Sequence, residues 1–76
     1  MRKLPVVSGR ETIRALERAG FYLARQEGSH NTLVHLQRRR RTTVTVHGNE
    51  DLPVGTLRTI LRQAGLTVDE FVDLLH

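Results

Sequence analysis

"HNTLVHLQRRRRTTVTVH", residues 30–47, is the stretch that decides the fold class. Residues 30–37 and 42–47 are short segments rich in β-branched side chains. In the second segment Val44 and Val46 alternate strictly with threonines and a histidine, a period of two that is typical of a strand with one buried face. The arginine run from Arg38 to Arg41 lies between the segments, so the stretch predicts two antiparallel strands with this run as the hairpin tip.

The segments before this hairpin predict a helix and a further strand. "SGRE" (8–11) has Ser8 and Glu11 at the spacing of a capping box, which indicates a helix start. Apolar residues then recur at helical spacing, and Gly20 is a natural stop. "FYLAR" (21–25) is short and aromatic, which favours a strand. The helix carries three arginines four residues apart on its polar side: Arg10, Arg14 and Arg18.

Two helices are predicted after the hairpin. "TLRTILRQAG" (56–65) has apolar residues at the i, i+3, i+4, i+7 spacing of an amphipathic helix and ends at Gly65. "TVDEFVDLL" (67–75) begins with a second capping box, Thr67 to Glu70. We interpret this acidic, apolar tail as a short helix that completes the core. The alternative is a segment that binds a partner.

The order of elements predicts an α+β fold. A three-stranded antiparallel sheet buries one face, so the first two helices should pack together on that face. The order α-β-β-β-α, with a short extra C-terminal helix, is that of double-stranded-RNA-binding-like domains; this is an analogy of fold alone. The chain of 76 residues contains no linker or repeat, and we expect a single domain, 1–76.

Composition favours a cytoplasmic protein that binds nucleic acid. Cysteine is absent, and neither an apolar signal region nor a membrane-length apolar run occurs. Residues 1–66 carry a charge near +7 and the tail from Thr67 near −3. All basic residues except Lys3 are arginines, whose planar fork suits phosphate and stacks on bases. A basic surface without a ligand is the alternative interpretation.

Several catalytic classes lack their signatures in this sequence. There is no cysteine, and no histidine pair has helical metal-ligand spacing, so neither a metal nor a small-molecule cofactor is expected. No glycine-rich phosphate loop or nucleophile elbow is present. A histidine within a basic protein remains, and this suits RNA cleavage, in which the ribose 2′-hydroxyl attacks the adjacent phosphorus. Imidazole can transfer the protons and arginine can hold the phosphate charge.

His30 is the leading candidate for this chemistry because Gly28 and Ser29 place it in a turn at a strand edge. From the residues alone, a hydrogen-bonded structural role for His30 is the stronger alternative. Strand parity sends His35 to the opposite face, which predicts an ordinary strand role. His47 ends the third strand and could flank His30 if the two strands pair closely there. His76 is terminal.

The chain resembles the HicA-type (YcfA-like) toxins of bacterial type II toxin–antitoxin pairs. The resemblance covers nearly the whole chain and is carried by "SGRETIRALERAGF" (8–21), "RQEGSH" (25–30), "VTVHGNEDLPVGTLRTILRQAGLT" (44–67) and the "VDEFVDLL" tail. It implies the same fold, metal-independent cleavage of mRNA and a small HicB-like antitoxin that covers the active site. It also implies that His30, in the "GSH" motif, is the catalytic residue and that Gly28 and Ser29 shape its turn.

Two segments depart from the family pattern. The hairpin, which often has a glycine- or proline-bearing turn, is "QRRRR" here, and the segment often written Val-Pro-Val-His is Val44–Thr45–Val46–His47. The first departure leaves the geometry of the hairpin open.

The leading hypothesis is an mRNA-cleaving toxin in which His30 acts as general base or acid on single-stranded or locally paired mRNA. RNA contacts are expected from six residues, of which the arginines would bind phosphates: Arg25, Ser29, Arg38, Arg39, Arg40 and Arg41. A solvated hairpin tip is the alternative for the arginine run. A non-catalytic RNA-binding module is the rival function, and a third interpretation makes the protein chiefly the partner of an acidic antitoxin.

Overall fold

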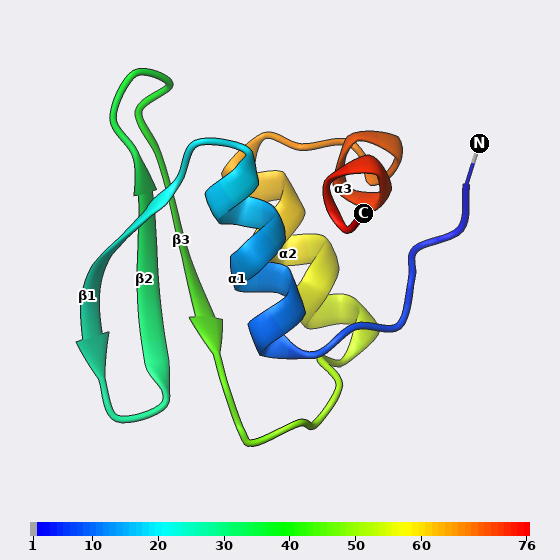
Figure 1. Ribbon diagram of the computed structural model, residues 1–76, viewed down its shortest axis with the longest axis horizontal. Helices are drawn as coiled ribbons and strands as arrows, with labels where there is room; N and C mark the ends of the chain where they lie inside the picture. Colours follow the sequence, from blue (N-terminus) through cyan, green and yellow to red (C-terminus); the bar gives the residue numbers. More distant parts are fainter. Residues whose placement is uncertain (1) are drawn as a thin grey trace.

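The computed structural model describes residues 2–76 and confirms the predicted α+β architecture. The elements follow the expected order: α1 (Gly9–Arg18), β1 (Tyr22–Glu27), β2 (His30–His35), β3 (Arg40–Thr45), α2 (Val54–Ala64) and α3 (Val68–Leu74). The strands form one antiparallel sheet in the order β1-β2-β3. Figure 1 shows α1 and α2 side by side on one face of this sheet, with α3 on their far side.

The first hairpin is closed by a loop of only two residues. Glu27 of β1 pairs with His30 of β2, so the loop is Gly28–Ser29. Gly28 has φ 56°, and a Cβ added there would meet no atom within 4 Å. Lack of space is therefore not what favours glycine here. The left-handed backbone that this tight turn requires favours it instead.

The second hairpin turns earlier than the sequence predicts. β2 ends at His35, which pairs with Arg40, so the loop consists of residues 36–39. The amide of Arg39 donates to the Leu36 carbonyl (3.2 Å), and Arg39 takes φ 55°. An arginine thus occupies the left-handed position that glycine fills in many such turns. The prediction that the whole arginine run forms the tip is wrong for Arg40 and Arg41, because cross-strand pairing extends to them.

A bulge in β1 changes which of its side chains share a face with β2. Leu23 pairs with Leu33, but Arg25 pairs with Thr32, so Ala24 is an extra residue on the bulged strand. Beyond the bulge, Arg25 and Glu27 therefore point to the same face as Thr32 and His30. In a regular strand paired from the Gly28–Ser29 turn, Leu23 would lie opposite Val34, so the bulge is what places Tyr22 on this face.

The core lies between the inner face of the sheet and the helices. Leu33 and Val44 enter it from β2 and β3 with no exposed surface, and Thr42 ties β3 to α2 through a hydrogen bond to Gln63 Oε1 (2.8 Å). The helices and the preceding segment contribute Val7, Ala15, Leu16, Leu57, Ile60, Leu61, Ala64 and Phe71. β1 lies at the edge, and all six of its residues are exposed. No helix of residues 2–76 covers the outer face of the sheet (Figure 1).

Both predicted capping boxes are present, and both predicted glycine stops follow their helices. Ser8 Oγ accepts from the Glu11 amide (3.2 Å), and Glu11 accepts from the Ser8 amide (2.9 Å). Thr67 and Glu70 repeat this arrangement at the start of α3. Phe71 of α3 is fully buried, and Arg18 of α1 donates to the Leu74 carbonyl (2.7 Å). The C-terminal helix is thus part of the core, as predicted.

Candidate active site

His30 begins β2 and lies on the outer face of the sheet. Its strand alternates in burial, with Asn31, Leu33 and His35 buried on the inner face. His30 is exposed, so the predicted separation of His30 and His35 onto opposite faces is confirmed. The imidazole that the sequence analysis selects is therefore accessible to a large ligand such as a nucleic acid strand.

Thr45 of β3 is the residue directly opposite His30. The two form a cross-strand pair, and Thr45 Oγ1 lies 3.5 Å from His30 Nδ1. Which of the two groups donates depends on the imidazole tautomer. Because this contact engages Nδ1, the second ring nitrogen, Nε2, is the one left for a ligand on the open face.

Glu27 stands on the other side of His30. The two residues pair across β1 and β2, a relationship that places Cβ atoms about 5 Å apart. Glu27 also forms an ion pair with Arg25 on the same face. Both side chains of this ion pair are more than half exposed, so it adds little to stability. Its effect is to hold one carboxylate and one guanidinium beside the imidazole.

A shallow hollow of about 250 Å³ surrounds these groups. It contains one imidazole, one carboxylate, two guanidinium groups and two hydroxyls. The residues that line it come from all three strands: Arg25, Glu27, His30, Thr32, Arg41 and Thr43. Proton-transfer groups and cations for a phosphate thus share one open surface. We call this surface the His30 hollow.

The structure divides the arginine run between two faces. Arg41 lines the His30 hollow, and Arg39 and Arg41 both line the adjoining depression toward the hairpin tip. Arg38 instead lies beside α3, where it lines a hollow with Glu70 and Asp73. Hydrogen bonds from Thr67 hold the pKa of Glu70 below its ordinary value, and the Arg38 charge acts in the same direction.

Arg40 also points to the helical side. A Cβ added to Gly65 would lie 3.0 Å from the Arg40 guanidinium, so this cation lies against the C-terminal end of α2. A cation is stabilised there by the helix dipole. Of the expected phosphate ligands, the structure brings Arg25, Arg39 and Arg41 to the face of His30 and places Arg38 beside α3. Arg40 lines the depression toward the hairpin tip, while its guanidinium lies against the end of α2.

His47 and His35 stand apart from the His30 hollow. β3 ends at Thr45, and His47 follows it outside the strand without lining the hollow. Its carbonyl accepts from the Glu50 amide (3.0 Å) in the turn that leaves the sheet. His35 packs edge-on against Phe21, and its Nδ1 accepts from the Arg38 amide (3.2 Å). The predicted strand role of His35 is thus confirmed.

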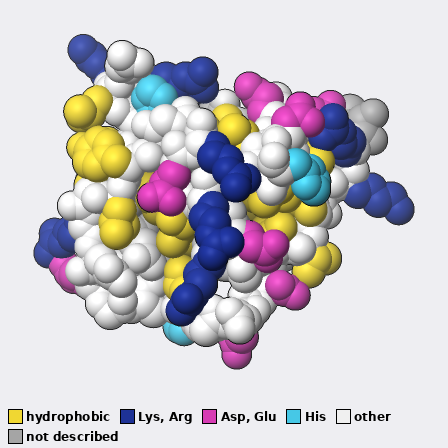
Figure 2. Space-filling model, in the orientation of Figure 1, with side chains coloured by type: hydrophobic (Ala, Val, Ile, Leu, Met, Phe, Trp, Pro, Cys, Tyr) yellow, Lys and Arg dark blue, Asp and Glu magenta, His cyan; other side chains and the backbone are white. Residues whose placement is uncertain are grey.

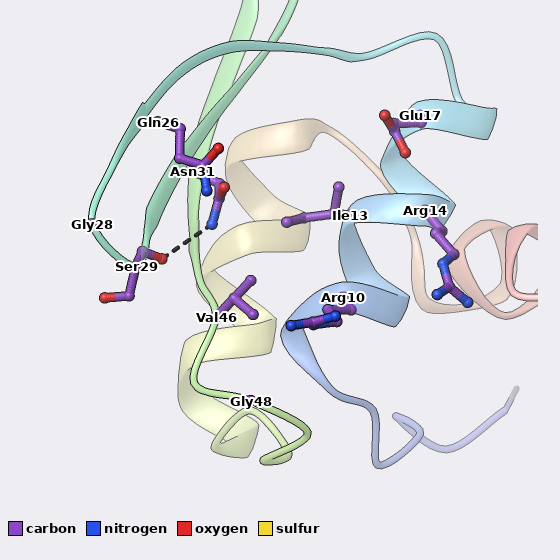
Figure 3. Close-up of a pocket in the computed structure, with 10 residues that line it drawn as sticks. All are labelled: Arg10, Ile13, Arg14, Glu17, Gln26, Gly28, Ser29, Asn31, Val46 and Gly48. Carbon is purple, nitrogen blue, oxygen red and sulfur yellow. Dashed lines mark hydrogen bonds between the residues drawn. The ribbon is translucent and has the colours of Figure 1, made fainter.

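Ser29 faces a separate depression between α1 and the first hairpin (Figure 3). Its carbonyl accepts from Asn31 Nδ2 (3.0 Å) and from the Val46 amide (2.9 Å), while Figure 3 shows its hydroxyl pointing away from Asn31. Arg10 and Arg14 line the α1 side of this depression, whose volume is about 480 Å³. Ser29 thus fixes the turn through its backbone and does not line the His30 hollow.

The arginines of α1 form a basic surface distinct from the His30 hollow. Arg10, Arg14 and Arg18 are all exposed, as the sequence predicts. Figure 2 shows a column of basic side chains along the middle of the molecule, over α1. Basic side chains therefore border the sheet on its outer face and also cover the first helix.

Glu27 and Thr45 are two neighbours of His30 that the sequence analysis does not select. Glu27 could have been found from the two-residue Gly28–Ser29 turn, which makes its flanking residues a cross-strand pair. A prediction that Thr45 lies opposite His30 requires the length of the second hairpin loop, and the arginine run offers no clear signal for that length.

Residues 2–76 contain neither a cluster of metal ligands nor a membrane-length apolar helix. No group of three or more side chains from His, Cys, Asp and Glu is placed to hold a metal ion in this part of the chain. None of the helices described here is long and apolar enough to cross a membrane.

Comparison with known proteins gives one family match. The sequence model for the family described as "HicA toxin of bacterial toxin-antitoxin" matches residues 9–66, more than half of the chain. No curated protein matches the chain. The matched range contains all of β1, β2 and β3, and with them every residue that lines the His30 hollow.

Proposed function

The chain belongs to the HicA family of toxins from bacterial toxin–antitoxin pairs, and from this membership we propose that it is a metal-independent endoribonuclease that cleaves mRNA. His30 is its catalytic histidine. One observation carries the proposal: His30 stands on an open face between Glu27 and Thr45, with two guanidinium groups in the same hollow. Because mRNA is its substrate, the toxin acts in the cytoplasm.

The proposed reaction uses the nucleophile of the RNA itself. The ribose 2′-oxygen attacks the adjacent phosphorus while its proton passes to a base, and the bond from phosphorus to the 5′-oxygen breaks. The departing 5′-oxygen receives a proton from an acid, which leaves a 2′,3′-cyclic phosphate and a 5′-hydroxyl. The atoms balance without a metal ion or a cofactor. The protein has to move two protons and to stabilise the charge on the phosphorane.

His30 carries one of these proton transfers, and Glu27 is the candidate for the other. An imidazole and a carboxylate can exchange the roles of acid and base, and these two project from paired positions on one face. Arg25 and Arg41, which line the same hollow, supply positive charge for the phosphate oxygens. Thr45 orients the imidazole through Nδ1.

A cognate antitoxin follows from the family, and we propose that a HicB-like protein covers the outer face of the sheet. That face carries the His30 hollow, and no helix of residues 2–76 lies over it. Its guanidinium groups would attract an acidic partner and speed its association. Occupation of this face by the antitoxin would exclude RNA from His30 and so neutralise the toxin.

The proposal is tested by His30→Ala, with His47→Ala as the matched control. Loss of a general acid or base lowers a rate by about 10²- to 10⁴-fold. We expect this loss of RNA cleavage for His30→Ala, together with loss of growth arrest on expression. His47→Ala, outside the hollow, should behave as the unmodified protein. Cleavage by His30→Ala at the normal rate contradicts the catalytic assignment.

A non-catalytic RNA-binding module is the second candidate, and one observation favours it. Basic side chains lie along α1 (Figure 2) as well as in the His30 hollow, so the protein offers phosphate-binding groups away from His30. This candidate predicts RNA binding that weakens steeply with salt, without any shortening of the RNA. Electrophoresis of RNA incubated with the purified protein separates the two functions.

A further inference from the structure

We propose that the depression next to the His30 hollow, between the β1 bulge and the second hairpin tip, binds one unpaired nucleobase of the RNA substrate. We call it the base pocket. This inference rests on the proposed function for the identity of the ligand. The active-site residues contact the phosphate and ribose of the RNA, and the base pocket adds a contact with a base. Its volume is about 430 Å³, which lies within the range of pockets for small ligands.

The base pocket has an apolar floor. Ala24, Val34 and Leu36 line it, and Leu36 is 71% exposed at the start of the hairpin loop. Tyr22 pairs with Val34 across β1 and β2, so the phenol ring projects from the same face beside the pocket and is 45% exposed. Apolar and aromatic side chains that stay exposed in the free protein offer a surface on which a planar ring can stack.

The rim of the base pocket is cationic. Four arginines line the same depression as the apolar side chains, together with His35: Arg25, Arg39, Arg40 and Arg41. An apolar peptide would leave these guanidinium groups without partners, whereas a nucleotide satisfies both parts of the site. Its base covers the apolar floor, and its phosphates meet the arginines. This charge complementarity selects a nucleic acid strand as the occupant.

The base pocket is continuous with the His30 hollow. Arg25, Thr32 and Arg41 line both, and Arg25 and Arg41 thus stand between the imidazole and the apolar floor. Val34 lies four residues along β2 from His30, a distance of about 13 Å. The bound base therefore belongs to a nucleotide near the cleaved bond, and the strand runs along β2 with its phosphates between the two sites.

The two-residue turn and the bulge at Ala24 shape the region where the two sites meet. Because the turn pairs Glu27 with His30, Arg25 lies beside Thr32 on the outer face, where it lines both depressions. The bulge leaves the small Ala24 side chain at the pocket and places Tyr22 opposite Val34. A regular strand paired from this turn would place Leu23 opposite Val34 instead.

The test compares RNA oligonucleotides that lack one base at successive positions around the cleavage site. Binding is measured by fluorescence anisotropy with His30→Ala, which retains the base pocket. For this protein we expect one position at which removal of the base weakens binding by about 5- to 150-fold, the range for stacking of a base on an aromatic side chain. The pocket variant also carries Val34→Thr and Leu36→Ser. It should bind intact RNA more weakly than the His30→Ala parent by the same factor, and loss of that base should weaken its binding no further.

Val54→Ser is the matched control, since Val54 is an exposed valine (54%) at the start of α2 that lines neither site. In the His30→Ala background it should bind every oligonucleotide as the parent does. Equal binding of all base-deleted oligonucleotides by the parent overturns the inference. Unchanged RNA binding by the pocket variant also overturns it. If that variant binds RNA normally but loses affinity for the antitoxin, the inference is likewise overturned.

The outcomes also separate this inference from the proposed function. Discrimination between bases by a protein that never cleaves RNA supports the base pocket and contradicts the ribonuclease. Cleavage by the unmodified protein without discrimination supports the ribonuclease and contradicts the base pocket. Absence of any RNA binding contradicts both.

Discussion

His30 and Thr45 face each other across β2 and β3, with Thr45 Oγ1 3.5 Å from His30 Nδ1. At this length the contact is a weak hydrogen bond, which guides the ring more than it stabilises the fold. We predict that Thr45→Val lowers kcat by about 2- to 5-fold, equivalent to about 0.5–1 kcal/mol, and leaves KM unchanged. Steady-state cleavage of a short RNA measures both constants.

Thr59→Val is the control for this prediction, because Thr59 is an exposed threonine of α2 whose hydroxyl donates to the Gly55 carbonyl (3.1 Å). It should leave both constants unchanged. A Thr45→Val protein with unaltered kcat would show that the hydroxyl has no part in orienting the imidazole.

Glu27 should be needed for the second proton transfer, since it pairs with His30 on the same face. We predict that Glu27→Gln lowers kcat by about 10²-fold or more and removes one limb of the pH–rate profile. The isosteric amide keeps the size of the side chain but cannot carry a proton. Glu17→Gln, at an exposed position of α1, is the control. Normal activity of Glu27→Gln would show that Glu27 transfers no proton and that its role is limited to the ion pair with Arg25.

Arg41 and Arg38 should differ in effect although both belong to the arginine run. Arg41 lines the His30 hollow, whereas Arg38 lies beside Glu70 and Asp73 of α3. We predict that Arg41→Gln weakens binding of single-stranded RNA and reduces the slope of log K against log salt by about 0.7, the value for one phosphate contact. Arg38→Gln should leave that slope unchanged. Titrations at several salt concentrations measure it, and equal slopes for the two variants contradict the division of the run between faces.

Gly9 sets the approach of α1 to the end of β3 that carries Thr45. A Cβ added at Gly9 would lie 2.7 Å from the Thr45 carbonyl oxygen and 3.0 Å from Val46 Cγ2. We predict that Gly9→Ala lowers the free energy of unfolding by about 1–3 kcal/mol through overpacking, as measured in urea. Gly55→Ala, in the first turn of α2, is the control because its added Cβ meets no atom within 4 Å. It should be neutral or stabilising by up to about 1 kcal/mol.

Glu11 should make stability depend on acid pH. Hydrogen bonds from the Ser8 amide, and next from its side chain, hold the pKa of Glu11 below its ordinary value of 4.5. The folded protein therefore binds this proton less readily than the unfolded chain, and the contribution of Glu11 is present above pH 4.5 and lost as the pH falls through the folded pKa.

We predict that Glu11→Gln flattens the fall of the urea midpoint below pH 4.5. The amide keeps an oxygen that accepts from Ser8 but cannot titrate. Urea unfolding between pH 3 and 7 measures the effect. If the urea midpoint of Glu11→Gln falls in acid as steeply as that of the unmodified protein, the loss of stability comes from other carboxylates.

The local features of this fold were predictable from the residues. Ser8 with Glu11, and Thr67 with Glu70, cap helices through groups three residues apart, so nothing distant is needed to specify where α1 and α3 begin. The alternation around Val44 likewise determines which of its neighbours are buried. Gly28 and Ser29 make His30 a candidate from the residues alone, whereas its choice as the catalytic residue rests on the family resemblance, which several segments carry together.

The ends of the strands were not predictable. The arginine run has no glycine or proline to indicate where the chain turns, and Arg39 takes a left-handed conformation that sequence rarely signals. Pairing with His35 then drew Arg40 into β3. The four arginines that the sequence predicts to form one phosphate-binding tip therefore lie on two faces.

By itself, the sequence determined the order of the helices and strands, the caps that start α1 and α3, and the placement of His30 at a strand start. The two-residue turn already pairs Glu27 with His30, but tertiary structure decided which residues of β3 and of the first half of β1 share its face. That outcome depends on the register of β2 with β3 and on the bulge at Ala24, which places Tyr22 and not Leu23 opposite Val34. Successive side chains of a strand point to opposite faces, so a shift of one residue exchanges every neighbour, and only the packing of the whole sheet on α1 and α2 fixes that shift.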